Sequence, residues 1–369
     1  MKKTIAYCLG AAAFALTAHA PAAAATGVAA DGLQAMRELN LIVLGNLTNG
    51  QHVQGKAFIG GNLENNVTVA QGGSQSYTAS NRAQLTVGGN ANGFKVESGL
   101  GSPLSAIIGG SARDMTLNGP GRVDVGGNVN IQNFNPNAGK TVVYGGTLSG
   151  NQPQDAAHLT RNAGYAASGT GIAATVAKQT ATLDADLSAL SLRLSQLGAL
   201  STINGTNTAL DYTGATDGFA VFTMTAAAFQ DQNANFDTLF GAMPNGMTTI
   251  VNVLGTNLVQ GGNLNGSKLN QSVIWNFASA TSIATKGWHG SILAPNATLR
   301  NSSAIEGSVA VRNFIMDGEV HLGTYQGGSA FLAPASPVPE AATWAQMLLG
   351  FTLAGAAFRR RRRMFPAAA

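Results

Sequence analysis

The stretch Val87-Gly88-Gly89-Asn90 is one of five copies of a short motif, an apolar residue followed by two glycines and a small polar residue. The first glycines of successive copies are 28, 21, 17 and 19 residues apart. Most copies follow a short strand-like segment. A strand, a Gly-Gly corner and a return of about 20 residues describe one coil of a parallel β-solenoid. The other copies are Ile59-Gly60-Gly61-Asn62, Ile108-Gly109-Gly110-Ser111, Val125-Gly126-Gly127-Asn128 and Tyr144-Gly145-Gly146-Thr147.

Glycine suits such corners because it tolerates positive φ and leaves room where neighbouring backbones crowd. Asparagine beside it tolerates left-handed conformations and can stack in ladders between coils. An alternative interpretation is a set of unrelated hairpin turns in a β-sandwich.

The repeat stops at a segment of different character, from Ile172 to Leu200. Its apolar residues are spaced by three or four, which predicts one helix with a leucine stripe on a single face. We expect this helix to lie along the solenoid and cover one side of its core. A dimerising coiled coil is the alternative, although the stripe lasts only about two heptads. The stripe comprises Val176, Leu183, Leu187, Leu190, Leu194 and Leu197.

After the helix, segments rich in Val, Ile, Phe and Thr predict further buried strands. The sequence therefore predicts that residues 26–335 form a discontinuous, right-handed parallel β-solenoid. The helix of about 172–200 is inserted between its two sets of coils. The predicted strands are Gly218–Thr225, Thr248–Val253, Ser272–Phe277, Gly290–Ala294, Ile305–Val311 and Glu319–Leu322.

The N-terminus has the form of a secretory signal peptide, residues 1–25. Lys2 and Lys3 form a basic region, Ile5 to Leu16 an apolar region, and a stretch of alanines supplies cleavage sites near Ala25. Signal peptidase is therefore an expected partner. An uncleaved membrane anchor is the alternative.

The C-terminus carries a short motif, an apolar run and a cationic block, and this order resembles a PEP-CTERM sorting signal over residues 336–363. The motif is Val338-Pro339-Glu340-Ala341, with Ala341 where the usual pattern has a second proline. The run 341–358 is about the length of a membrane span, and residues 364–369 form a tail. The resemblance implies an exosortase-type protease as partner; a plain tail anchor is the alternative. The cationic block, which favours the cytoplasmic side, is Arg359, Arg360, Arg361, Arg362 and Arg363.

Removing both signals changes the charge of the protein. Seven of the 21 basic residues lie in them, so the mature chain has 14 basic residues against 16 or 17 acidic ones. The remaining net charge of −2 or −3 gives no support for nucleic-acid binding. The single cysteine, Cys8, also lies in the signal peptide, which excludes disulfides and thiol chemistry from the mature protein.

No motif for catalysis, cofactors or metals stands out. The remaining histidines, His52, His158, His289 and His321, are far apart in sequence. His289 beside Trp288 is the most interesting, although a surface role suffices for it. Asp114 and Asp124 could face each other on adjacent coils, but a glycosidase pair or a calcium site needs more convergence than this. Asp184 and Asp186 should point apart on the helix.

Four segments together resemble the choice-of-anchor A family of bacterial surface proteins: Leu41–Leu47, Val53–Asn62, Val273–Phe277 and Gly290–Ala297. The resemblance covers residues 38–328, and the last segment also resembles ice-binding-like solenoids. It implies an extracellular domain with interchangeable anchors. Collagen binding is attributed to some relatives, but no residue here carries that activity over.

The sequence thus predicts an exported, non-catalytic protein with a structural or adhesive role linked to exopolysaccharide or biofilm. It would pass through the inner membrane transiently before reaching the cell surface or medium. The alternative is a ligand-binding module that holds polysaccharide, a collagen-like chain or ice on a flat solenoid face. A carbohydrate-active enzyme is a third and weaker hypothesis.

Overall fold

The structure is a computed structural model that describes residues 26–73, 75–97, 100, 105–131, 139–150, 156–204, 209–231, 236–266 and 270–333. The predicted signal peptide of residues 1–25 lies outside these residues, as do the sorting motif, the apolar run 341–358 and the arginine block. Within the described part of the chain, none of the helices is both long and apolar enough to cross a membrane.

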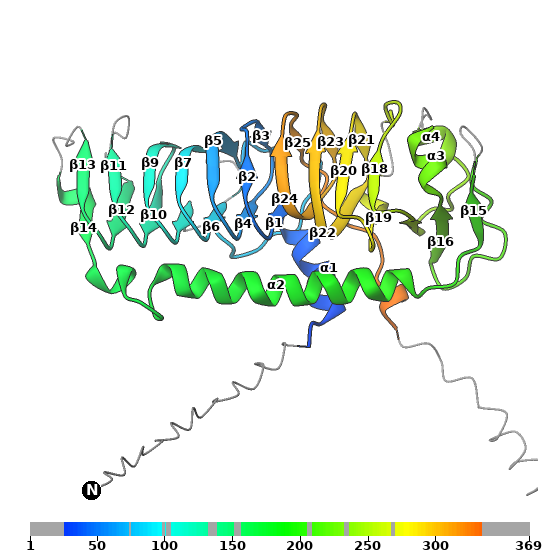
Figure 1. Ribbon diagram of the computed structural model, residues 1–369, viewed down its shortest axis with the longest axis horizontal. Helices are drawn as coiled ribbons and strands as arrows, with labels where there is room; N and C mark the ends of the chain where they lie inside the picture. Colours follow the sequence, from blue (N-terminus) through cyan, green and yellow to red (C-terminus); the bar gives the residue numbers. More distant parts are fainter. Residues whose placement is uncertain are drawn as a thin grey trace, which may run out of the picture.

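The N-terminal half is a stack of short strands that pair in parallel (Figure 1). Strands of one kind end just before each Gly-Gly pair and stack on one another, and strands of a second kind begin just after it and do the same. After helix α1 (Ala29–Glu38), the strands are β1 (Leu41–Val43), β2 (Leu47–Thr48), β3 (His52–Val53), β4 (Ala57–Ile59), β5 (Leu63–Val69), β6 (Leu85–Val87), β7 (Ala91–Glu97), β8 (Ala106–Ile108), β9 (Ala112–Asn118), β10 (Gly121–Val125), β11 (Val129–Ile131), β12 (Lys140–Tyr144), β13 (Leu148–Gly150) and β14 (Leu159–Arg161).

Crowding, rather than unusual dihedrals, explains the glycine pairs. Gly88 and Gly89 are not among the residues with positive φ. A Cβ on Gly88 would collide with the carbonyl oxygen of Gly60, the equivalent residue of the neighbouring layer. A Cβ on Gly89 would collide with the side chain of Asn62. The first glycine thus admits the neighbouring backbone, and the second admits a neighbouring side chain.

Helix α2 (Ile172–Ser195) then carries the chain along the whole stack to its other end (Figure 1). The helix ends five residues before the predicted Leu200. Its predicted stripe packs inward over Val176, Leu183, Leu187, Leu190 and Leu194, which are buried. The last predicted member, Leu197, lies beyond the end of the helix and is only partly buried against the same core.

The C-terminal half runs from the far end back toward the middle. Its elements are β15 (Ser201–Ile203), β16 (Phe219–Met224), α3 (Ala226–Gln230), α4 (Phe236–Leu239), β17 (Thr248–Val253), β18 (Asn257–Val259), β19 (Val273–Asn276), β20 (Ser282–Thr285), β21 (Trp288–His289), β22 (Ser291–Asn301), β23 (Ile305–Glu306), β24 (Val309–Met316) and β25 (Val320–His321). The predicted strand Ile305–Val311 is wrong as a single unit: it is divided between β23 and β24, with Gly307 at the break at a φ of 154°.

The two halves join in the middle of the stack. β1 pairs in parallel with β4 on one side and with β24 on the other. The chain therefore starts at the centre, fills one end, crosses under the stack and returns to the centre from the other end. All pairings between the named strands are parallel, which contradicts the alternative of hairpins in a sandwich.

Two apolar cores hold these layers together. Alternate residues of each strand point into the interior of the stack, as Leu41 and Val43 do, and the residue between them, Ile42, points out toward the helices. The second core therefore lies between one sheet face and α1 with α2. A buried polar cluster adds to it, because Asn276 donates from Nδ2 to the carbonyl of Ser191 on α2 and accepts from the Ser191 hydroxyl at 2.6 Å.

Candidate functional site

One face of the stack is formed by β2, β5, β7, β9, β11 and β13 and, beyond the joint, by β24, β22, β20 and β18 (Figure 1). The strand registers place a continuous row of small polar residues along this face. Each of these residues stands just before the first inward-pointing residue of its strand, or at the equivalent register position. We call this row the polar ladder. It comprises Asn257, Ser282, Thr298, Asn313, Asn46, Asn62, Asn90, Ser111, Asn128 and Thr147.

Side chain to backbone hydrogen bonds connect the ladder from layer to layer between Asn313 and Thr147, whereas Asn257, Ser282 and Thr298 belong to it by strand register. Oδ1 of Asn62 accepts from the backbone N–H of Asn90 at 2.8 Å, and Oδ1 of Asn90 accepts from the backbone N–H of Ser111 at 2.8 Å. Since a backbone N–H needs an acceptor, the side-chain oxygen faces the stack and the amide nitrogen is turned away. The predicted ladder of asparagines is confirmed, and its hydrogen bonds run from the backbone of one layer to the side chain of the next.

A second row lies two residues further along the same strands. We call it the outer row: Glu64, Asn92, Arg113, Asn130 and Ser149. Residues two apart on a strand project from the same face. The polar ladder and the outer row therefore form two parallel walls. The floor between them is the backbone of the inward-pointing residues that separate the two rows.

These walls enclose a groove with a volume of about 480 Å³. Arg113 donates from Nε to Oδ1 of Asn92 at 2.5 Å, which fixes the guanidinium over the groove. Oδ1 of Asn130 is buried and has no hydrogen-bond partner. Glu64 and Arg113 carry opposite charges, so the groove has no net charge from these two side chains. None of the described residues that line it is aromatic. The site can therefore act through hydrogen bonds rather than through stacking.

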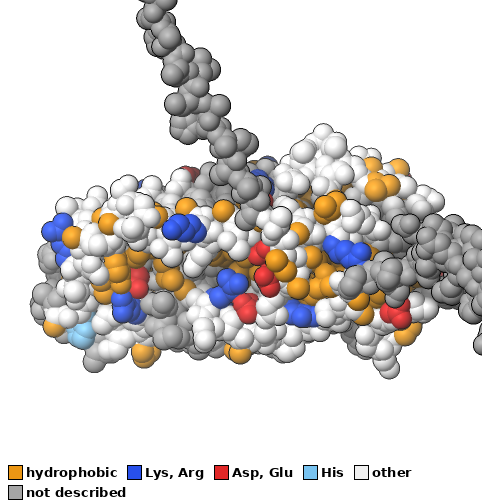
Figure 2. All heavy atoms as spheres, turned by 90° about the horizontal axis from the view of Figure 1, so that it is seen from below, with side chains coloured by type: hydrophobic (Ala, Val, Ile, Leu, Met, Phe, Trp, Pro, Cys, Tyr) orange, Lys and Arg blue, Asp and Glu red, His pale blue; other side chains and the backbone are white. Residues whose placement is uncertain are grey.

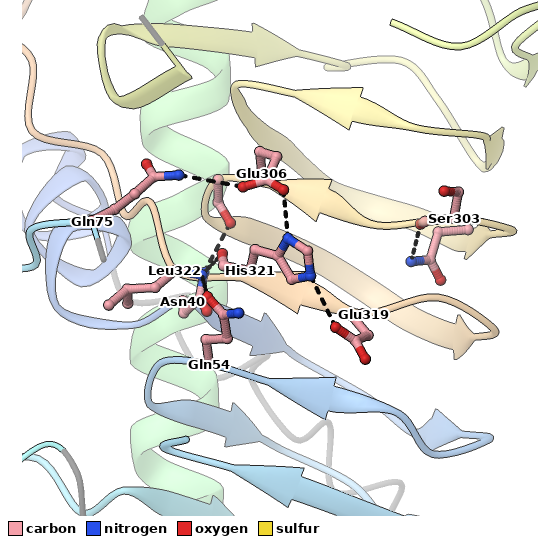
Figure 3. Close-up of polar contacts among 10 residues, drawn as sticks. Asn40, Gln54, Gln75, Ser303, Glu306, Glu319, His321 and Leu322 are labelled. Carbon is pink, nitrogen blue, oxygen red and sulfur yellow. Dashed lines mark hydrogen bonds and ion pairs between the residues drawn. The ribbon is translucent and has the colours of Figure 1, made fainter. Parts of the chain in front are cut away.

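A charged cluster marks the joint between the two halves, on the face next to this one (Figure 3). His321 on β25 bonds Glu306 through Nδ1 at 2.5 Å and Glu319 through Nε2 at 2.9 Å. Nδ1 of His52, on β3 of the other half, lies 3.6 Å from Glu319. The hydrogen bond to Glu306 is the main cause that raises the pKa of His321 to about 9; burial opposes it and the bond to Glu319 adds to it. This cluster connects the last strand to the first half of the chain.

The residues singled out in the sequence do not converge. Asp114 lies in β9 and Asp124 in β10, which do not pair with each other, and Asp124 binds Nε of Arg122 at 2.7 Å. His289 lies beside Glu306 in the register of β21 and β23. No group of three or more His, Cys, Asp or Glu in the described residues is placed to hold a metal ion.

Asp184 and Asp186 are separate, as expected. The carboxylate of Asp184 binds both terminal nitrogens of Arg312 on β24, at 2.7 and 2.8 Å. Oδ1 of Asp186 accepts from the backbone N–H of Val28, just before α1. Each therefore fastens α2 to a different part of the fold.

The face of the molecule that carries α1 and α2 is different from the polar face. Basic and acidic side chains lie next to one another there, among apolar side chains (Figure 2). No region of a single charge sign stands out on this face. This face therefore lacks the positive field expected of a site for a polyanion.

Neither the outer row nor the cluster at the joint was predicted from the sequence. A period-two alternation in β7 and β9 could have indicated which side chains point outward. The partnership of His52 with Glu319 has no signal in the local sequence, because the two residues belong to opposite halves of the chain.

One protein family corresponds to nearly the whole stack, from within α1 to the end of β25. A family model described as a putative ice-binding-like adhesive domain matches residues 32–322 of the chain. No match was found among curated proteins, and none among solved structures.

Proposed function

The chain belongs to the ice-binding-like adhesive domain family, and from this premise we propose that it is an exported cell-surface or extracellular-matrix protein that works by adhesion. The polar ladder with the outer row is the proposed adhesive surface. The observation that carries this proposal is the continuity of the ladder across both halves of the chain, since a repeated polar surface suits a repetitive polymer such as exopolysaccharide.

We also propose the finer fold assignment, a right-handed parallel β-solenoid of the choice-of-anchor A type. Its support is the parallel pairing of β4 with β6 and of β6 with β8, one layer after another. The position of α2 alongside the stack, and the central joint of β1 with β24, agree with a discontinuous solenoid.

Export and processing form a separate part of the proposal. The sequence of residues 1–25 supports cleavage by signal peptidase, and residues 336–363 support cleavage by an exosortase at a PEP-CTERM signal. The intact mass of the mature protein in strains with and without the exosortase tests this. A product that ends near Val338 to Ala341 only when the exosortase is present supports it; a chain retained in the inner membrane in both strains contradicts it.

Adhesion is tested with a strain from which the gene is deleted. We expect the deletion strain to retain less exopolysaccharide at its surface and to form less biofilm, and added mature protein to restore both. Unchanged exopolysaccharide retention and biofilm, with no binding of the mature protein to whole cells, would refute the adhesive role.

We propose that adhesion proceeds without catalysis. The test is turnover of a panel of acidic and neutral glycans by the wild type and by Asp114→Asn. Turnover that disappears in the variant would favour a carbohydrate-active enzyme instead.

A further inference from the structure

The groove between the polar ladder and the outer row has unused hydrogen-bonding capacity on both walls. On the ladder wall, Oδ1 of Asn62 and of Asn90 is engaged by the next backbone N–H, and each amide nitrogen is left as a donor. On the opposite wall, Oδ1 of Asn130 lacks a donor. Asn130 lines the groove, and its terminal torsion is soft.

The ladder wall therefore offers amide donors, and the outer row offers acceptors together with the donors of the Arg113 guanidinium. Glu64 adds an exposed acceptor to the outer row, and Ser149 adds a hydroxyl. A ligand that fits must carry groups able both to donate and to accept. Hydroxyl groups have this property, whereas a carboxylate group only accepts.

The spacing of the groove also favours a linear polymer. Successive layers of a sheet are about 4.8 Å apart, which is comparable with the length of one pyranose unit in an extended glycan. The groove crosses β5, β7, β9, β11 and β13, so a chain lying along the stack would meet a similar pair of walls at each layer.

The charges in the groove argue against two other ligands. Glu64 and Arg113 interrupt the regularity that a planar lattice such as ice would require. Arg113 already donates to Asn92, and Glu64 lies on the same wall, so the groove does not present a net positive charge to a uronic acid polymer.

We propose that this groove binds a neutral, hydroxyl-rich glycan chain that lies along the stack, with the amides of Asn62 and Asn90 on one side and Asn130 on the other. This inference rests on the proposed adhesive function and adds the site and the ligand class. Binding is weak for each layer and gains strength from the number of layers engaged, because the described lining residues contribute hydrogen bonds and no aromatic ring.

The test is binding of the mature protein to soluble neutral cello-oligosaccharides and to polygalacturonate, by calorimetry. We expect binding of the neutral glycan only, with an affinity that rises with chain length. Asn130→Leu should weaken it about three- to tenfold, as expected for the loss of one hydrogen bond. Because Oδ1 of Asn130 has no partner among the described residues, the thermal unfolding of the Asn130→Leu variant should stay unchanged.

Asn257→Leu is the matched control. Asn257 is an exposed member of the same ladder at the other end of the stack, outside the groove, and the substitution should leave binding within twofold. Equal losses in both variants would overturn the assignment of the site. Arg113→Gln separates the ligand classes: a loss above tenfold together with strong salt dependence would indicate an acidic polymer and overturn the inference.

The failure of this inference is distinguishable from that of the adhesive function. If the mature protein binds whole cells but does not bind the neutral glycan, and the groove variants leave cell binding unchanged, the inference is wrong and the adhesive function stands. If it binds no cells at all, the proposed function itself is wrong.

Discussion

The side-chain oxygen of Asn62 accepts a hydrogen bond of 2.8 Å from the backbone N–H of Asn90, the residue at the same position in the neighbouring layer. Gly89, the residue before Asn90, leaves the space in which the Asn62 side chain lies. The Gly-Gly-Asn motif is therefore a reciprocal device. Each copy supplies a side chain to the next layer and a cavity for the side chain of the previous one.

Asn90→Ala should lower the free energy of unfolding by about 1 kcal/mol, because the backbone N–H of Ser111 loses its acceptor. Asn257→Ala is the control, since its oxygen accepts only a hydroxyl at 3.4 Å in the described residues; we expect a change below about 0.5 kcal/mol. Denaturant unfolding measures both. Equal values for the two variants would show that the ladder bond does not stabilise the fold.

Gly89→Ala should cost about 1–3 kcal/mol, because the added methyl group overlaps the Asn62 side chain and must push it out of the ladder. Gly198→Ala, at a site just after α2 with no atom within 4 Å of the added Cβ, should have little effect. The measurement is the shift in melting temperature. A neutral Gly89→Ala would mean that the ladder can move aside without cost.

Leu187→Ala should cost about 2–5 kcal/mol, because Leu187 is fully buried between α2 and the sheet. Leu192→Ala on the same helix removes the same atoms from a side chain that is 58% exposed, so we expect less than about 0.5 kcal/mol. Denaturant unfolding of both variants tests whether α2 is part of the cooperative unit. Equal small effects would show that it is not.

The stability of the protein should fall as the pH rises from about 6.5 to 9, through the titration of His321. Its pKa is about 9 in the folded protein and 6.5 as an ordinary histidine, so the protonated form is favoured by folding. This contribution is complete below pH 6.5 and is lost as the pH rises through 9. His321→Gln should be less stable than the wild type at pH 6 and should approach it near pH 10.

The readout for His321 is the unfolding free energy of both proteins at several pH values between 6 and 10. A constant difference between them across this range would contradict the assignment of the titration to His321.

Local features of the structure were predictable from the sequence because they repeat or are periodic. The strand Thr248–Val253 was predicted with its observed bounds, since it is a continuous run of β-formers buried on both faces. Helix α1 was missed, because a segment of 10 residues with Gly32 in it has a weak helical pattern. Gly32 lies there because a Cβ would collide with the carbonyl of Asp186 on α2, which is a tertiary requirement.

By itself, the sequence determined the layers. The Gly-Gly pairs, the asparagines beside them and the leucine stripe act over a few residues or between equivalent positions, so their physical role can be read locally. Only the tertiary structure decided which layers meet. β1 lies between β4 and β24, and His52 lies beside Glu319, because α2 returns the chain to the far end of the stack before the second half is built. The segments that connect one layer to the next differ in length, so the sequence alone does not determine which side chains align between layers. The register of the pairing between layers is set by burial of the inward residues. It aligns the residues of the outer row with one another, and separately those of the cluster at the joint.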